Sequence, residues 1–360
     1  MEKITKKSLA VLVLAGLSQA SMAGVEFNLL PGSVGSGYSS FILEAPEVAN
    51  DGTVLAYVDS DWQTWNNDTG LSTLPGTNTA SVLQNNKLSN DANYLLFKGT
   101  GSNFNVHTPD GLIQRGSTGF EGRVIKQMSG NGKKLIAPAN YHNYISFYEE
   151  GGRYEERDPK RPDYSVRTSL TEDTRLRVAN NGVNETGNRL LVSHGAQTYF
   201  MDIEDSNDYN RIGNLTEIPY TFSKAIAISD DGQSALGTVR DLSPGCDISN
   251  VIYHETNGLT EIGCSDEFTL FGFSGDGSKV IGFTGYAGAP DTSYIWSETS
   301  GLRDLKDVLA QNGHNIGGWA SFKATDISED GLKITGMGTD ASGEDQVFLM
   351  EVVAECTADF

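Results

Sequence analysis

The chain has 360 residues, of which 26 are basic and 47 acidic, giving a formal net charge of −21. An acidic surface of this kind repels phosphate backbones and anionic lipid head groups, so we expect neither a nucleic-acid partner nor membrane-surface binding. The sequence contains no motif for a cofactor, and we expect none.

Residues 1–23 have the organisation of a secretory signal peptide. Three lysines precede a short apolar run from Leu9 to Leu17, which is too short to span a bilayer. Small residues at Ser21 and Ala23 predict cleavage before Gly24. The mature protein is therefore expected outside the cytoplasm, in the periplasm, on the cell surface or secreted, without membrane insertion.

A short pattern recurs along the rest of the chain and is clearest from Ala225 to Gly237, where two apolar runs flank a polar turn with a glycine. Such a turn predicts a β-hairpin, because glycine reaches positive φ without a Cβ clash. The equivalent turn positions are Gly52, Ala92, Gly132, Gly187, Gly232, Gly277 and Gly331. Steps of 40 to 55 residues between them are typical of a repeat architecture.

A second hairpin follows most of these turns, with a Gly-Leu pair that opens its last strand. The pairs are Gly70-Leu71, Gly111-Leu112, Gly258-Leu259 and Gly301-Leu302. Two hairpins make four strands in each repeat, which is the size of one propeller blade. The sequence predicts an all-β fold, a seven-bladed β-propeller in which residues 24–360 form one domain.

The two ends of the chain complete this expectation. The strand predicted at 346–353 lacks an outer partner, and the strand predicted at 25–30 can supply one. Pairing the N- and C-terminal strands would close the ring and remove exposed sheet edges. Small residues recur five places after the turn glycine, as at Gly237 and Gly336, and predict close packing between neighbouring sheets.

Two insertions interrupt the period. Residues 151–177 hold a cluster of basic side chains, including Arg157 and Arg161, and form either a functional loop or a solvated loop with internal ion pairs. Residues 304–313 predict a short helix, with Asp304 as N-cap and Gly313 just beyond its end.

The candidate binding site is Tyr141, His142 and Tyr144, with Arg157 and Arg161 of the next repeat step nearby. Tyrosine, histidine and arginine together could neutralise a uronate carboxylate and abstract a proton. The alternative is a tyrosine-rich strand with one exposed histidine.

One predicted hairpin accounts for two of the three cysteines. Cys246 and Cys264 flank a predicted strand pair, so a structural disulfide is expected, while Cys356 is left over. Neither the cysteines nor the five histidines have zinc-ligand spacing, and we expect no metal site.

The stretch from Tyr294 to Gly336 carries the most specific pattern: a Trp strand, Gly-Leu, Asp-Leu, a short helix, Gly-Trp and an Ile-Ser-x-Asp-Gly turn. This pattern resembles the HAF family of extracellular repeats, found in exported bacterial proteins. The resemblance implies a β-propeller-like exported protein and supplies no catalytic motif.

These features favour an exported, monomeric, non-catalytic propeller that binds a protein or a glycan. The alternative is a carbohydrate-active enzyme, a lyase on an acidic polysaccharide using Tyr141, His142 and the nearby arginines. A purely structural surface protein is a third interpretation.

Overall fold

The computed structural model describes the greater part of the chain from Val25 to Val352. The described residues are 25–31, 46–58, 61–73, 87–98, 103–117, 127–138, 144–150, 162–168, 176–204, 208, 210–264, 269–284, 292–314 and 316–352. The predicted signal peptide, residues 1–23, lies outside them.

The described residues form an all-β protein with one short helix, and four of its five sheets have four strands. The first two of these sheets contain β2 (Glu47–Val48), β3 (Val54–Val58), β4 (Asp61–Asn66) and β5 (Gly70–Thr73), and then β6 (Lys87–Leu88), β7 (Leu95–Lys98), β8 (Asn103–Thr108) and β9 (Gly111–Ser117). The other two contain β22 (Thr269–Phe273), β23 (Lys279–Thr284), β24 (Thr292–Ser297) and β25 (Gly301–Asp304), and then β26 (Ser321–Ile327), β27 (Lys333–Thr339), β28 (Asp345–Val352) and β1 (Val25–Leu29).

The fifth sheet has twelve strands, made of three successive groups of four. They are β10 (Gln127–Met128), β11 (Lys134–Pro138), β12 (Tyr144–Glu149) and β13 (Tyr164–Arg167); β14 (Leu176–Val183), β15 (Arg189–His194), β16 (Gln197–Ile203) and β17 (Asn210–Glu217); and β18 (Phe222–Ile228), β19 (Ser234–Ser243), β20 (Cys246–His254) and β21 (Gly258–Cys264). Two parallel pairs, β13 with β17 and β14 with β18, join these groups, whereas the pairing inside each group is antiparallel. We call the successive four-stranded groups units 1 to 7, starting at β2; unit 7 consists of β26, β27, β28 and β1.

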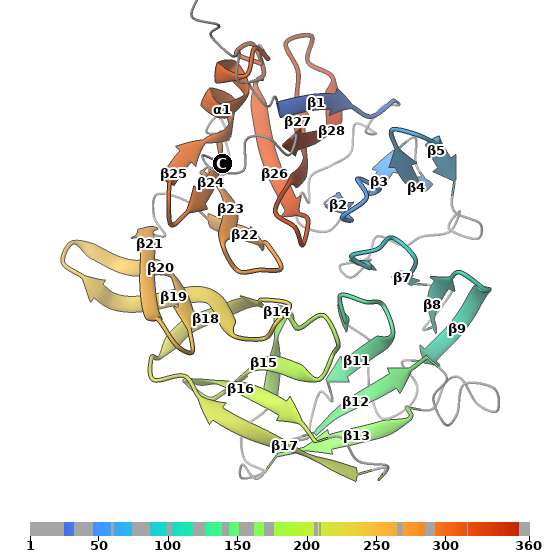
Figure 1. Cartoon of the computed structure of the whole chain (residues 1–360), viewed down its shortest axis with the longest axis vertical. Coiled ribbons are helices and arrows are strands. Elements are labelled where there is room, and N and C mark those ends of the chain that lie inside the picture. The colour runs from blue at the N-terminus through green and yellow to red at the C-terminus, as the bar shows by residue number, and fades with distance from the viewer. Residues whose placement is uncertain are drawn as a thin grey trace, which may run out of the picture.

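The first and last strands of the described chain lie side by side. Strand β1 pairs antiparallel with β28, with Val25 opposite Val352 and Leu29 opposite Phe348. Figure 1 shows the units set around a common centre in chain order, with dark blue β1 beside red β28. The N-terminal strand therefore belongs to the sheet of the C-terminal unit.

Apolar side chains fill the space between units. Each of the seven hydrophobic clusters of the described residues draws on two neighbouring units. Leu55 and Phe97 join units 1 and 2, for example, and Val48 and Met337 join units 1 and 7. The second strand of a unit is covered on both faces, which explains its continuous apolar sequence.

The predicted helix is confirmed as α1 (Leu305–Gln311). The carboxylate of Asp304 accepts a hydrogen bond from the Lys306 N–H at 2.7 Å and caps the first turn. Leu305, Val308 and Leu309 are buried on one face, and Gly313 follows the helix with φ 85°.

The small residues after the turn have a cause different from the predicted one. A Cβ on Gly237 would lie 2.5 Å from the carbonyl oxygen of Lys224, and a Cβ on Gly336 would lie 2.0 Å from that of Lys323. Both carbonyls belong to the adjacent strand of the same sheet, where the register shifts at a bulge. The crowding therefore comes from a bulged first strand within the unit, and not from packing between sheets.

A seven-residue helix falls well short of a membrane span, and none of the described residues belongs to a helix long and apolar enough to cross a bilayer.

Candidate functional site

In each unit a turn of the form Ser-x-Asp-Gly, or a close variant of it, joins the first two strands, and its side chains explain its sequence. The Ser229 hydroxyl accepts from the Ser234 N–H at 2.9 Å and donates to Asp231 Oδ1 at 2.6 Å. The same Oδ1 accepts from the Gln233 N–H at 2.8 Å, and the Gly232 N–H donates to the Ser229 carbonyl. Turns that begin at Ser89, Ser129, Ser274 and Ser328 repeat this pattern.

The fourth residue of every turn has positive φ. Six of the seven are glycines, and Ala92 adopts φ 58° in the second turn. A side chain of the preceding unit also packs against the glycine. A Cβ on Gly132 would lie 2.3 Å from Tyr94, and one on Gly232 would lie 2.7 Å from Arg189. Conformation and packing both select glycine here.

The second residues of the seven turns form what we call the turn ring: Asn50, Asn90, Gly130, Glu185, Asp230, Gly275 and Glu329. Main-chain hydrogen bonds of 2.7–3.2 Å connect successive turns, as from the Glu185 N–H to the Asp230 carbonyl and from the Asp230 N–H to the Gly275 carbonyl. The last turn returns to the first through the Asn50 side chain, which accepts from the Asp330 N–H at 3.2 Å.

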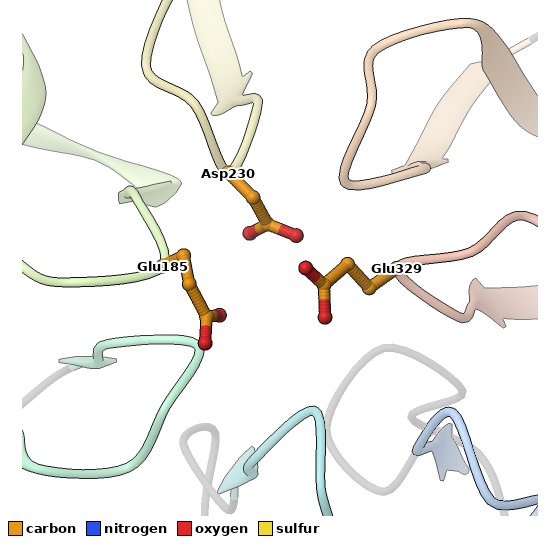
Figure 2. Close-up of side chains that lie close together, drawn as sticks. All are labelled: Glu185, Asp230 and Glu329. Atoms are coloured by element: carbon orange, nitrogen blue, oxygen red, sulfur yellow. The ribbon is translucent and has the colours of Figure 1, made fainter.

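Three acidic members of the turn ring meet at its centre, and we call them the central carboxylates. Glu185, Asp230 and Glu329 come from three units and point toward one another, as Figure 2 shows. Each offers a carboxylate oxygen within 4.8 Å of the other two. Two glycines of the ring leave room for them: a Cβ on Gly130 would lie 2.1 Å from Glu185, and one on Gly275 would lie 1.9 Å from Asp230.

Side-chain amides donate hydrogen bonds to this cluster. Asn90 Nδ2 donates to Glu185 Oε2 at 2.6 Å and lies 3.4 Å from Asp230 Oδ2, while Asn50 Nδ2 donates to Glu329 Oε2 at 2.7 Å. Within the described part of the chain, the central carboxylates take part in no ion pair with lysine or arginine. The negative charge is thus solvated by amides and not neutralised by a side-chain cation.

Proximity and burial change the acidity of the cluster. Burial, and then the negative charges of Glu329 and Glu185, raise the pKa of Asp230 to about 8. Burial, followed by the charges of Glu329 and Asp91, raises the pKa of Glu185 to about 7. Near neutral pH the cluster therefore holds protons that separate carboxyl groups would have lost.

A cavity of about 130 Å³ extends along the ring from these carboxylates. Asn90, Asp230 and Glu329 line one part of it, and the apolar residue two places before each turn-ring member lines another. Those apolar residues are Val48, Leu88, Met128, Val183, Ile228, Phe273 and Ile327. Gln127 also lines the cavity; it is only 5% exposed, and its Oε1 has no hydrogen-bond partner.

A second charged group lies in the cavity wall. Lys87 Nζ lies 2.8 Å from Glu47 Oε1, and Asp326 Oδ2 accepts from the Val48 N–H at 2.9 Å. Burial and the charge of Glu47 raise the pKa of Asp326 to about 7, against the opposing effect of Lys87. This group has its own cation, unlike the central carboxylates.

The third turn residues form an acidic rim around the centre. They are Asp51, Asp91, Asp231, Asp276 and Asp330, and all five are exposed. Burial raises the pKa of Asp91, but hydrogen bonds from Ser89 and Asn93 outweigh it and the net pKa is lowered. For the pKa of Asp276 burial is likewise outweighed, by hydrogen bonds from Ser274 and Ser278. Asp91 and Asp276 therefore carry negative charge at neutral pH.

Most residues of the predicted binding site lie outside the described residues: Tyr141, His142, Arg157 and Arg161. Tyr144 opens β12, where its backbone pairs with Arg167. The tyrosine–histidine–arginine site therefore stays a prediction. Cys246 and Cys264 are joined by a disulfide, with Cα atoms 5.6 Å apart, between neighbouring strands β20 and β21. Cys356 lies outside the described residues.

The central carboxylates were not among the residues that the sequence pattern indicated. The signal that could have found them is their shared position: Glu185, Asp230 and Glu329 each stand two places before a turn glycine. Because hydrogen bonds connect successive turns, residues at this equivalent position can lie close together although they are far apart in sequence.

Comparisons with known proteins bear on the fold. No family model matches the chain, and no curated protein matches it. A chain of the solved structure described as "Crystal Structure of Mitotic Checkpoint Complex" matches with a TM-score of 0.53 and 14% identity, over 96% of this chain and 98% of that one. TolB from Acinetobacter baumannii matches with a TM-score of 0.42 and 16% identity, over 70% of this chain and 60% of that one. The fold is thus of the β-propeller type.

Proposed function

We propose that this protein is an exported, non-catalytic, seven-bladed propeller that binds a basic protein partner through its acidic rim. Three features support seven blades in a closed ring. The β1–β28 pairing joins the chain ends, the hydrophobic clusters run from each unit to the next, and Asn50 links the last turn to the first. A ring of this kind is a rigid platform with short, protected edges.

The acidic rim is the observation that carries the binding proposal. Five exposed aspartates surround the central carboxylates on the face that holds the turns, in a chain of net charge −21. Negative charge on a surface attracts a positively charged partner during association and repels acidic polymers. A basic protein surface therefore fits better than an acidic polysaccharide.

The size of the central cavity points to the same mode of binding. Its volume of about 130 Å³ is well below the roughly 300–1,000 Å³ of pockets that enclose small-molecule ligands. A macromolecule would therefore bind across the rim and not inside the ring. The similar chain from the mitotic checkpoint complex was solved as part of a complex, which fits a role in protein binding.

Export is supported by two independent features. The lysines and apolar run of residues 1–23 have the order of a signal peptide, and Cys246 and Cys264 form a disulfide. Mass spectrometry of the exported protein should give Gly24 as its first residue.

The binding test uses two variants with the same charge change. The rim variant replaces Asp51, Asp91, Asp231 and Asp276 by Asn, which keeps the turn because Asn131 already makes the equivalent hydrogen bonds in unit 3. The control variant neutralises four exposed acids at the opposite ends of the strands: Glu217→Gln, Asp241→Asn, Asp247→Asn and Glu344→Gln.

Partners would be captured from the exported protein fraction by site-specific crosslinking at the rim, then purified and their affinities measured directly. We expect a basic partner whose Kd rises at least about tenfold in the rim variant or at high salt, and is unchanged in the control variant. Equal loss in both variants would contradict binding by the rim.

The catalytic alternative is tested separately. The protein is incubated with acidic and neutral polysaccharides, and the products are separated by size. Intact polymers are expected. New short oligosaccharides that disappear in His142→Ala would replace the scaffold proposal by the lyase, and retained but intact polymers would make the protein a glycan-binding module.

A further inference from the structure

We infer that Asn257, which precedes Gly258 in the turn between β20 and β21, is a site of spontaneous deamidation that yields aspartate and isoaspartate. Asparagine is one of the chemically labile residues of proteins. The sequence contains four Asn-Gly pairs, which begin at Asn131, Asn181, Asn257 and Asn312. The structure distinguishes them by the exposure and the hydrogen bonds of the asparagine. The inference is independent of the partner-binding proposal.

The reaction takes place between an asparagine side chain and the next backbone nitrogen. The Gly258 nitrogen attacks the side-chain carbonyl carbon of Asn257, an N–C bond forms, and the amide group leaves as ammonia with the proton of the Gly258 N–H. Water then opens the resulting succinimide ring at either carbonyl, which gives aspartate or isoaspartate. Water is the only other reactant. Glycine favours the attack because it has no Cβ beside its nitrogen.

The Asn257 side chain is free to make this approach. Asn257 is exposed, whereas the asparagines of the other three pairs are half-buried. The Thr256 and Asn257 N–H groups donate to His254 Nδ1 at 3.0 and 3.3 Å, so main-chain groups hold the turn. Within the described part of the chain the Asn257 side-chain amide makes no hydrogen bond. A Cβ on Gly258 would meet nothing within 4 Å, so the turn has room to rearrange.

The pair in the third turn is restrained on both sides of the reacting bond. Asn131 Oδ1 accepts from the Ser129 hydroxyl at 2.8 Å and from the Lys133 N–H at 3.1 Å. The Gly132 N–H donates to the Ser129 carbonyl at 2.8 Å, and the Tyr94 side chain packs against Gly132. These hydrogen bonds must break before the side chain and the nitrogen can react.

The remaining two pairs are held by secondary structure. Asn312 Nδ2 donates to the Val308 carbonyl at the end of α1, at 2.8 Å. Asn181 lies within β14, and the Gly182 that follows it is buried. A Cβ on Gly182 would lie 2.9 Å from the Leu191 carbonyl oxygen, so the main chain there has little room to move. Asn257 is therefore the pair that the fold protects least.

Deamidation would change the face of the protein that carries the acidic rim. The Glu255 N–H donates to the Gln233 carbonyl at 3.1 Å and joins the β20–β21 turn to the turn that contains Asp231. Each event adds a carboxylate to this region. Isoaspartate also leads the main chain through Cβ, which lengthens the backbone of the turn.

The experiment compares the four pairs within one sample. Purified protein is kept at mildly alkaline pH, folded or in urea, and samples are taken over several weeks. They are digested at mildly acidic pH, which limits deamidation during digestion, and peptide mass spectrometry measures aspartate and isoaspartate at each position. The control variant Asn257→Gln keeps an exposed amide at the same place, and anion-exchange chromatography follows the more acidic form of the whole protein.

In the folded protein we expect Asn257 to deamidate at least about tenfold faster than the other three, because their hydrogen bonds and contacts must first be lost. In urea the four rates should become similar, since the fold no longer restrains any of them. The more acidic form should accumulate in wild type and be lost in Asn257→Gln. Equal or faster reaction at another pair in the folded protein would overturn the assignment. So would an Asn257 that stays intact while the urea sample reacts, or an acidic form that persists in Asn257→Gln.

Discussion

Asn50 in the first turn and Glu329 in the last turn are joined directly: Asn50 Nδ2 donates to Glu329 Oε2 over 2.7 Å. The Asp330 N–H donates back to Asn50 Oδ1 over 3.2 Å. One side chain thus replaces the main-chain hydrogen bond that connects other neighbouring turns. Together with the β1–β28 pairing, it ties the end of the repeat array to its beginning.

Asn50→Ala should weaken this link. It removes the donor to Glu329 and leaves the Asp330 N–H unpaired, at a cost of about 1–2 kcal/mol in the free energy of unfolding. Urea denaturation followed by circular dichroism measures the loss. Asn214→Ala, an exposed position of β17, is the control and should cost almost nothing. Equal stability of wild type and Asn50→Ala would show that the contact contributes nothing to the free energy of unfolding.

The free energy of unfolding should decrease as the pH rises, because the pKa of Asp230 is raised in the folded protein. Its pKa is raised from the ordinary 3.8 to about 8 in the folded protein, so the folded state holds a proton that the unfolded state has lost. Between about pH 4 and pH 8 the unfolded state therefore binds fewer protons, and the free energy of unfolding decreases as the pH rises. Below this window both states are protonated, and above it the full penalty applies.

Asp230→Asn removes the penalty. At pH 8 the free energy of unfolding of this variant should exceed that of wild type by up to about 5 kcal/mol, and the difference should shrink toward zero at pH 4. Denaturation midpoints measured across this range give the slope. Asn214→Ala, an exposed position of β17 that does not titrate, should keep the wild-type dependence on pH. A wild-type stability that rises between pH 5 and pH 8 would contradict the raised pKa.

Sequence patterns could predict the all-β repeat architecture because each turn is determined locally. The hydrogen bonds of Ser229, Asp231 and Gly232 all form within six residues. The same turn can therefore be predicted in every repeat that contains these residue types. The Asp304 cap and the buried face of α1 are equally local and were predicted correctly. The reason for Gly237 was not, because the bulge opposite it lies in a strand whose register the sequence does not reveal.

The central carboxylates depend on distances between repeats. In the sequence, Glu185, Asp230 and Glu329 share a position two places before a turn glycine, but this position alone does not show that the three side chains meet. Their proximity arises only when the turns meet around one axis, where Gly130 and Gly275 leave the space. The predicted tyrosine–histidine–arginine site was based on residues that are close in sequence. Most of these residues lie outside the described residues.

Substitutions at two turn glycines distinguish the stability cost of a positive φ from that of a steric contact. Gly301 has φ 67° and nothing within 4 Å of a Cβ, whereas Gly132 has φ 75° and a Cβ there would lie 2.3 Å from Tyr94. Gly301→Ala should cost about 1 kcal/mol, from positive φ alone. Gly132→Ala should cost roughly 3 kcal/mol or more, because buried Tyr94 must move. Ala92→Gly should be neutral or slightly stabilising.

Urea denaturation of the three variants provides the comparison. The order of stability is the decisive result, because it is independent of the absolute costs. If Gly132→Ala were no less stable than Gly301→Ala, the contact with Tyr94 would have no energetic importance, and the glycine would be needed for its conformation only.

The disulfide between Cys246 and Cys264 should stabilise the fifth unit. The cysteines are separated by 18 residues, and a loop of this length contributes about 3 kcal/mol by restricting the unfolded chain. Replacing both cysteines by alanine, or reducing the protein, should lower the free energy of unfolding by about that amount. Cys356→Ala is the control and should leave stability unchanged. Thiol labelling under denaturing conditions should find Cys246 and Cys264 protected in the exported wild type; three free thiols would contradict both the disulfide and export to an oxidising compartment.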